Sequence, residues 1–156
     1  KADRVIIPGG GQAASAMKSL DQRKLISTLA GLTRPVLGIC LGMHLLCRFS
    51  AEGGTRCLEI TEDSVLSFPV SVKIPHMGWN TVYGLRDPLF AGIPEGTYFY
   101  FVHSFRAPVG NRTIARCDYA GPFSAGLRTG NFAGLQFHPE KSGPAGERIL
   151  RNFCQE

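Results

Sequence analysis

The spacing of hydrophobic positions along the chain predicts two kinds of secondary structure. Residues 4–7 and 35–37 form short apolar runs that read as buried strands. Residues 22–32 carry apolar side chains at 25, 26, 29 and 32, which is helical spacing, and Asp21 is the predicted N-cap. A further helix is predicted directly after Cys40. Strands that alternate with helices are typical of a parallel sheet covered by helices.

The middle of the chain instead carries short β-type runs that turn residues separate. We predict strands at 65–68, 70–74, 81–83, 97–102 and 113–117. A final hairpin is predicted from 124–127 and 132–137 around the turn at 129–131, and a closing helix at 145–154. The fold class is therefore predicted to be α/β, with a largely parallel sheet, helices on its faces and a smaller antiparallel β region.

Composition narrows the class of protein further. The 156 residues are enough for one domain, predicted to span 1–156, and no apolar run is long enough to cross a membrane. The five cysteines are odd in number and contain no CxxC pair, which argues against disulfides and against a zinc site. We therefore expect a reducing, cytoplasmic location, no metal and no cofactor. The net charge of +5 comes from scattered basic residues, so neither a nucleic acid nor a membrane partner is expected.

The segment around Cys40 carries the strongest chemical signal. Gly38 and Gly42 flank the cysteine between a predicted strand and a predicted helix. This is the pattern of a nucleophile on a sharp strand-to-helix turn, where residues without side chains avoid crowding. The helix N-terminus is expected to lower the thiol pKa, and its N–H groups could hold an oxyanion. A lone cysteine is more often a core residue, but the glycines and the strand-helix context reverse that expectation.

A second segment, 137–140, supplies a base and a carboxylate. His138 and Glu140 are two residues apart in a chain that Pro139 keeps extended, so both side chains can face one target. Together with Cys40 they make a nucleophile, a base and an orienting group. A histidine beside a proline is by itself more often structural, so the argument depends on both segments occurring in one chain.

These segments resemble the class I (triad) glutamine amidotransferase domain. Residues 38–43 (GICLGM) match the nucleophile elbow of that family, and 136–142 (QFHPEKS) match its His/Glu segment. Residues 73–80 (KIPHMGWN) and 100–105 (YFVHSF) are similar to the group of glutaminase subunits of imidazole glycerol phosphate synthase. The resemblance covers nearly the whole chain. It implies a flavodoxin-like, doubly wound sheet and a catalytic triad at Cys40, His138 and Glu140.

The resemblance also implies a substrate, a reaction and a partner. Glutamine would be hydrolysed to glutamate and ammonia through a cysteine thioester, and the ammonia would pass to a (βα)8-barrel cyclase in histidine biosynthesis. The implied oxyanion and substrate-binding residues are Gly9, Gly10, Gly11, Leu41, His44, His103, Ser104 and Phe105. The implied partner interface is Pro75, His76, Met77, Gly78, Trp79 and Asn80. Trp79 suits an interface as an aromatic anchor, and a core tryptophan is the alternative.

Several positions depart from the family pattern. His44 stands where glutamine is usual, Gly10 where valine is usual, and Phe105 where tyrosine is common. The family also has a strand and a helix that would precede Lys1, so we expect the first strand here to leave a sheet edge on which two copies could pair as a homo-oligomer.

These departures keep two alternatives open. One is a catalytically impaired interaction module that retains the amidotransferase fold. The other is a different Cys-dependent α/β hydrolase, although such enzymes usually lack a His-x-Glu segment on a late strand.

Overall fold

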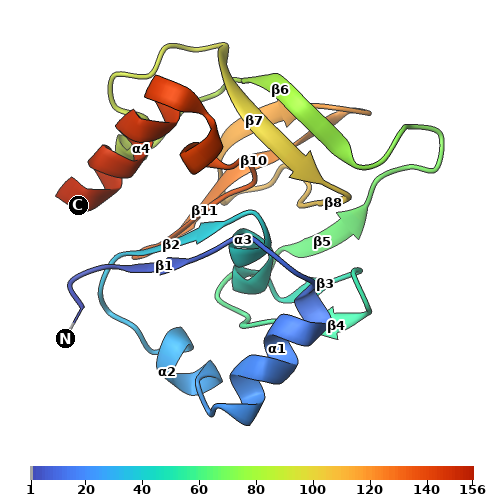
Figure 1. The fold of residues 1–156 in the computed structure, drawn as a ribbon, viewed down its shortest axis with the longest axis vertical. Helices are drawn as coiled ribbons and strands as arrows, with labels where there is room; N and C mark the ends of the chain where they lie inside the picture. The colour runs from blue at the N-terminus through green and yellow to red at the C-terminus, as the bar shows by residue number, and fades with distance from the viewer. Residues whose placement is uncertain (1) are drawn as a thin grey trace.

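The computed structural model describes residues 2–156 and centres on a five-stranded sheet (Figure 1). Its strands are ordered β1-β2-β11-β10-β9. Their bounds are Val5–Ile7 for β1, Val36–Ile39 for β2, Phe132–Leu135 for β11, Pro122–Thr129 for β10 and Thr113–Asp118 for β9. The β1–β2 and β2–β11 pairings are parallel, whereas β11–β10 and β10–β9 are antiparallel. The parallel part of the sheet is β1-β2-β11, and the predicted final hairpin extends it with antiparallel pairings.

Helices cover both faces of this sheet. Alternate residues of β2 point to opposite faces, and all four are buried, so each face needs a covering layer. Leu37 and Ile39 belong to one core cluster with α4 (Gly143–Gln155). Val36 belongs to the other, with α1 (Ala13–Gln22), the short α2 (Ile26–Ala30) and α3 (Leu41–Leu46). In Figure 1, α4 accordingly lies on the opposite side of β2 from α1 and α2. The α/β class with helices on both faces is confirmed.

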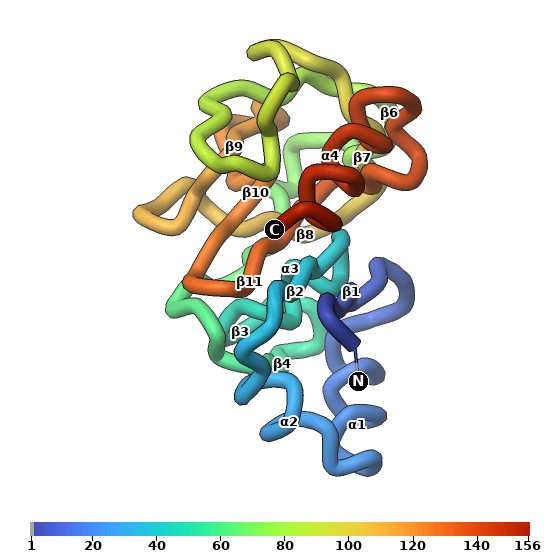
Figure 2. The backbone as a smooth tube through the Cα atoms, turned by 90° about the vertical axis from the view of Figure 1, so that its left-hand side faces the viewer, coloured from blue at the N-terminus to red at the C-terminus, as the bar shows by residue number. Residues whose placement is uncertain are grey.

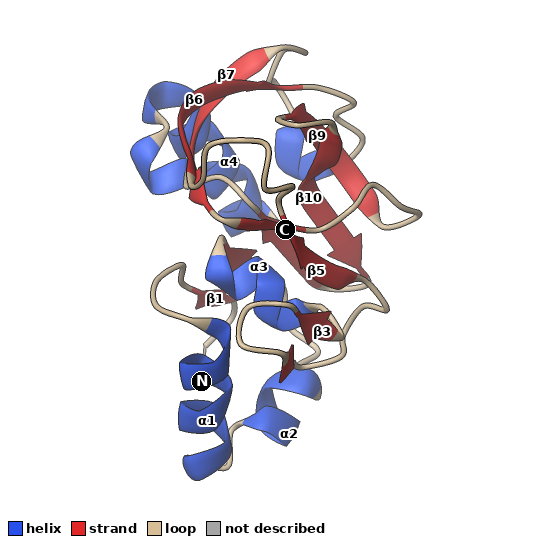
Figure 3. Ribbon diagram, turned by 90° about the vertical axis from the view of Figure 1, so that its right-hand side faces the viewer, coloured by secondary structure: helices blue, strands red, loops and turns tan. Residues whose placement is uncertain are grey.

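Two smaller β structures complete the fold. The strands β3 (Phe49–Ser50), β4 (Thr55–Arg56), β5 (Ser64–Ser67) and β8 (Phe105–Arg106) form a four-stranded group. The strands β6 (His76–Val82) and β7 (Thr97–His103) form an antiparallel pair, the β6–β7 ribbon. Single turns of 3-10 helix occur at Pro88–Phe90 and Pro139–Lys141. Figures 2 and 3 show the ribbon at the end of the molecule opposite to α1 and α2.

Two sequence predictions are corrected. The helix expected at 22–32 is reduced to α2, because Lys24 has a left-handed φ of 56°, which a continuous helix cannot contain. Asp21 lies inside α1 rather than at an N-cap. The helix α1 itself was missed, since its run of alanine and serine gives little periodicity. The strand expected at 70–74 is a turn, and its Val70 is fully exposed.

Three other predicted elements are confirmed, and the predicted pairing of two copies through a sheet edge stays a prediction. The helix after Cys40, the final hairpin and the closing helix are confirmed as α3, β10–β11 and α4. In residues 2–156, β1 lies at the end of the sheet and pairs with β2 alone, so the homo-oligomer through this edge stays a prediction. In the same residues no helix is both long and apolar enough to span a membrane.

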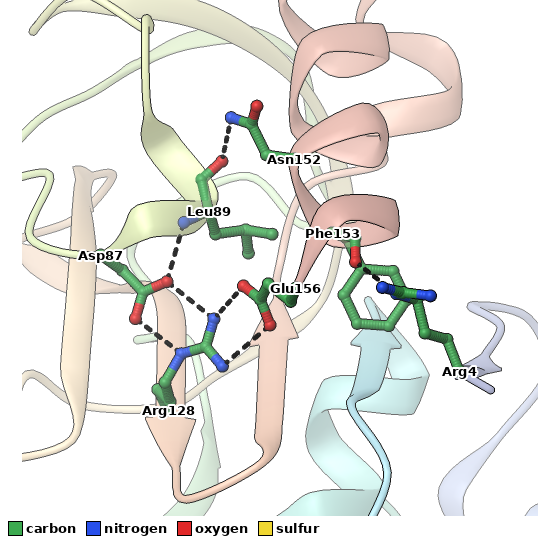
Figure 4. A network of polar contacts seen from close by, with 7 residues as sticks. All are labelled: Arg4, Asp87, Leu89, Arg128, Asn152, Phe153 and Glu156. Atoms are coloured by element: carbon green, nitrogen blue, oxygen red, sulfur yellow. Dashed lines mark hydrogen bonds and ion pairs between the residues drawn. The ribbon is translucent and has the colours of Figure 1, made fainter.

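A network of ion pairs and hydrogen bonds joins the final hairpin to the last turns of α4 (Figure 4). The Arg128 guanidinium donates to both carboxylate oxygens of Asp87, at 2.6 and 2.7 Å, and to Glu156 at 2.6 Å. Asp87 in turn accepts from the Leu89 N–H, and Asn152 donates to the Leu89 carbonyl. The Asp87 side chain is only 6% exposed, so its charge depends on Arg128 for compensation.

We predict that Arg128→Ala lowers the free energy of unfolding by about 2 kcal/mol, because it leaves the Asp87 carboxylate buried and unpaired. Arg151→Ala is the matched control, since its partner Glu147 and Arg151 itself are both largely exposed. The control is expected to cost less than about 0.5 kcal/mol. Urea denaturation measures both, and equal losses would contradict the prediction.

Candidate functional site

Cys40 occupies a strained turn between β2 and α3. Its φ of 49° and ψ of −105° are unusual for a residue with a side chain. A Cβ on Gly38 would lie 2.5 Å from the Gly42 carbonyl, and a Cβ on Gly42 would collide with the Ile7 carbonyl of β1. Both glycines are therefore required for the close approach of α3 to the sheet, as the sequence pattern predicts.

The sulfur of Cys40 is held by two polar contacts. Its thiol donates to the Val102 carbonyl on β7 at 3.7 Å, and the Gln136 side-chain amide donates to the sulfur at 3.8 Å. The carbonyl oxygen of the Gln136 amide lies 2.7 Å from His44 Nε2. Gln136 is completely buried and His44 nearly so. The sulfur thus lies at the end of a buried polar chain that begins on α3.

Burial raises the pKa of the Cys40 thiol to about 11. The N–H of Leu41 and the amide of Gln136 act in the opposite direction, while the charges of Glu140 and Glu52 add to the rise. The Leu41 N–H at the start of α3 lowers the pKa, as the strand-to-helix turn predicts, but burial outweighs it and the thiol stays protonated near neutral pH. The helix α3 has six residues, and its Leu41 N–H does not offset the loss of water around the sulfur.

His138 and Glu140 form the pair that their spacing predicts. His138 Nδ1 lies 2.7 Å from Glu140 Oε1, with the imidazole buried and the carboxylate 45% exposed. The backbone N–H of His138 donates to the Tyr100 carbonyl of β7, and its carbonyl accepts from the Ser142 hydroxyl at 2.7 Å. These bonds fix the backbone on both sides of the ring. With Nδ1 occupied by the carboxylate, Nε2 is the nitrogen left for chemistry.

Cys40 and His138 converge at Gly9, in the loop after β1. A Cβ on Gly9 would lie 2.7 Å from Cys40 Cβ and 3.1 Å from His138 Cε1. The two side chains therefore approach the same point, although no hydrogen bond joins them in residues 2–156, where the sulfur contacts Val102 and Gln136 instead. Gly10 has open space around its missing Cβ, and Gly11 has a left-handed φ of 88°.

A cavity of about 290 Å³ opens beside the sulfur. Of the residues implied by the resemblance, it is lined by Gly11, Leu41, His44, His103, Ser104 and Phe105, together with Cys40. Pro75, from the expected partner interface, also lines it, whereas His138 does not.

Three residues near this cavity were not assigned by sequence reasoning. Glu52 and Val102 line it, and Gln136 contacts the sulfur from behind. Gln136 was visible as the first residue of the QFHPE run, but nothing in its position along the chain showed that its amide meets Cys40. The Glu52 carboxylate also accepts from the Ala13 N–H at the start of α1.

His103 belongs to a buried chain of imidazoles at the back of the cavity. Its Nδ1 donates to the Phe105 carbonyl at 2.7 Å, and its Nε2 lies 2.8 Å from His76 Nδ1. The amide of Asn80 donates to the far nitrogen of His76. Burial lowers the pKa of His103 to about 3 and that of His76 to about 4, so both rings are neutral near pH 7.

The expected interface segment 75–80 alternates between inward and outward residues along β6. His76 is buried, whereas Met77 is 61% and Trp79 is 55% exposed. On the facing strand, Tyr98 is 59% exposed, and Tyr100 packs edge-on against the indole. The alternative of a core tryptophan is therefore wrong, and the ribbon presents an apolar outer face.

The class of site follows from these contacts. A cysteine on a glycine-flanked elbow, next to a His–Glu pair and an open cavity, is suited to nucleophilic attack on an acyl or amide carbon. In residues 2–156 no three His, Cys, Asp or Glu side chains gather as a metal site would require.

Comparison with known proteins agrees with this class. The family model for class-I glutamine amidotransferases matches residues 1–156. The imidazole glycerol phosphate synthase subunit HisH of Shewanella loihica is 48% identical over 165 residues, which cover 99% of this chain and 74% of that protein. The HisH subunit of Bacteroides fragilis is 49% identical, with 99% of this chain and 80% of that protein covered. The chain therefore belongs to the class-I glutamine amidotransferase family.

Solved structures support the fold. A candidate GMP synthase component from Thermoplasma acidophilum superimposes with a TM-score of 0.73 at 21% identity, over 98% of this chain and 71% of that chain. A glutamine amidotransferase from Thermotoga maritima gives a TM-score of 0.63 at 20% identity, over 98% of this chain and 63% of that chain.

The raised pKa predicts how Cys40 reacts with iodoacetamide. Alkylation should be slow near neutral pH and should accelerate about tenfold per pH unit until the pH approaches 11. Mass spectrometry of tryptic peptides follows Cys40 separately from Cys154, whose exposed thiol is the internal control. A rate that stops rising below about pH 9 would contradict the prediction.

Proposed function

We propose that the chain is the glutaminase subunit of an imidazole glycerol phosphate synthase, acting as one cytoplasmic domain over residues 1–156. The observation that carries the proposal is the convergence of Cys40 and the His138–Glu140 pair at Gly9. The relatives named as HisH subunits support the assignment of pathway. All five cysteines are free, which supports a reducing compartment.

In the proposed reaction, Cys40 attacks the side-chain amide carbon of glutamine as a thiolate. The thiol proton passes to His138 Nε2, and the resulting imidazolium is stabilised by Glu140. The tetrahedral oxyanion accepts from the Leu41 N–H and from the loop of Gly9, Gly10 and Gly11. His138 then protonates the departing ammonia, which leaves a γ-glutamyl thioester. Water activated by His138 attacks the thioester, releasing glutamate and restoring the thiol.

The cavity has suitable chemistry for glutamine. Its volume of about 290 Å³ accommodates a small amino acid, and the Glu52 carboxylate at its wall can pair with an α-ammonium group. Ser104 offers a hydroxyl and Phe105 an apolar wall. His44 and His103 line the same space, and we propose that they shape it.

The proposed partner, a (βα)8-barrel cyclase, would dock on the outer face of the β6–β7 ribbon. That face exposes Met77, Trp79 and Tyr98, residue types that are enriched in the cores of protein interfaces. Docking there would also shield the ammonia from bulk water on its way to the cyclase. In bulk water ammonia is protonated and loses its nucleophilicity. The other residues proposed for the interface are Pro75, His76, Gly78 and Asn80.

The interaction-module alternative has one observation in its favour. In the structure the Cys40 thiol donates to Val102 rather than to His138, and burial holds it protonated. An assay with the partner present separates the two functions, because ribbon docking could release the sulfur. Glutamate release with partner and cyclase ligand supports the enzyme, and none under those conditions supports the module. The other alternative, a different Cys-dependent hydrolase, is disfavoured by family membership.

Cys40→Ser is predicted to reduce glutamate release to background, and Glu140→Gln to reduce it by about a hundredfold or more, since the imidazolium loses its counter-charge. Both are measured with the cyclase partner and its ligand present. Cys154→Ser is the matched control, because its thiol is exposed and remote, and it should retain full activity. Full activity of Cys40→Ser would end the proposal.

Trp79→Ala is predicted to weaken cyclase binding by about thirtyfold, the loss typical of a central aromatic anchor. Leu25→Ala removes another exposed apolar side chain, at the opposite end of the molecule, and should leave the affinity unchanged. Isothermal titration calorimetry measures both. An affinity for Trp79→Ala within about twofold of the wild type would argue against docking on this face.

A further inference from the structure

The polar chain behind Cys40 has a defined direction. Its last bond runs from the Gln136 side-chain nitrogen to the sulfur, so the amide oxygen must face the other way. That oxygen lies 2.7 Å from His44 Nε2 and can only accept, so His44 must donate from Nε2. The orientation of the Gln136 amide is therefore determined by the ring that stands behind it.

Both side chains that lead to the sulfur, Gln136 and His44, are shielded from water. Gln136 is completely buried on the segment that follows β11, and His44 is 4% exposed in α3. A buried amide that loses one partner is destabilised by the full desolvation of the unpaired atom, and it would turn to find another. Without the His44 donor, nothing described around the amide oxygen would keep the Gln136 nitrogen aimed at the sulfur.

We propose that His44 and Gln136 are positioning residues for Cys40: His44 orients the Gln136 amide, and the N–H of that amide stabilises the sulfur as a thiolate. This inference rests on the proposed function in taking Cys40 as the nucleophile. It gives His44 a role different from direct substrate binding, because the Nε2 of its ring is already engaged by Gln136.

The charges around Cys40 oppose the effect of this donor. Glu140 on the His138 side and Glu52 across the cavity both disfavour the thiolate. His138 and His103 also face this region, from the segment after β11 and from β7. Against the two carboxylates and the loss of water, the donors that act on the sulfur are the Leu41 N–H and the Gln136 amide. Of these two donors, only the Gln136 amide belongs to a side chain.

The test measures Cys40 alkylation by iodoacetamide at about pH 9, read by peptide mass spectrometry on the whole chain. Gln136→Met removes the donor and is expected to slow alkylation of Cys40 about tenfold. His44→Leu should slow it by a similar factor. His44→Gln should restore the rate to within about twofold of the wild type, because its amide can also donate to Gln136.

A double variant separates positioning from general damage. If His44 acts through Gln136, His44→Leu with Gln136→Met is no slower than Gln136→Met alone. Two effects that multiply would overturn the proposed order of action. Met43→Leu is the matched control, since it changes the buried neighbour of His44 on α3 without touching the polar chain, and it should leave Cys40 alkylation unchanged.

Folding is monitored in the same digests through Cys117, which is buried and reacts only if the chain opens. Should His44→Leu expose Cys117, His44→Met replaces it, and Gln136→Met decides the issue independently. A wild-type rate of Cys40 alkylation in folded Gln136→Met would overturn the inference. Because alkylation needs neither glutamine nor a partner, a chain without glutaminase activity that still gave this pattern would refute the proposed function but retain the inference.

Discussion

The contact on which the site depends is the close approach of α3 to the first two strands. Gly42 packs directly against the Ile7 carbonyl, and Gly38 packs against the Gly42 backbone. A methyl group at either position would push the helix away from the sheet. The tightness of this packing is what holds Cys40 at a positive φ, a conformation that costs of the order of 1–3 kcal/mol in an isolated chain. The position of the sulfur is thus a consequence of backbone packing.

One strand, β7, contacts both the Cys40 segment and the His138 segment of the site. Its Val102 carbonyl accepts from the Cys40 thiol, and the backbone of its Tyr100 bonds to His138 and to the Ser142 hydroxyl. The same Tyr100 packs against Trp79 on the exposed outer face of the ribbon. The strand β7 therefore connects the acceptor of the Cys40 thiol to the exposed outer face of the ribbon.

Burial and polarity oppose each other at this centre. Removing water from Cys40 favours the neutral thiol, and a small number of directed donors, rather than a positive charge, acts against that effect. The His76–His103 pair is built in a similar way, since two neutral rings satisfy one another and the Phe105 carbonyl. At the end of α4, by contrast, full charges meet directly, as Arg128 bridges Asp87 and Glu156.

Local sequence patterns were enough to predict the α/β class, the elbow at Cys40 and the His138–Glu140 pair, because each depends on residues that are close neighbours in the chain. Glycine spacing and period-two spacing are local rules, and they survive any tertiary arrangement. The sequence failed at α1, whose small residues carry little periodicity, and at 70–74, where β-type side chains lie in a turn. Three features emerge only when the chain is folded: Gln136 contacts the sulfur, Trp79 faces outward, and burial outweighs the helix terminus in its effect on the Cys40 pKa. Each of these features depends on contacts and burial between segments that are far apart in the sequence, and the spacing of neighbouring residues does not predict such contacts.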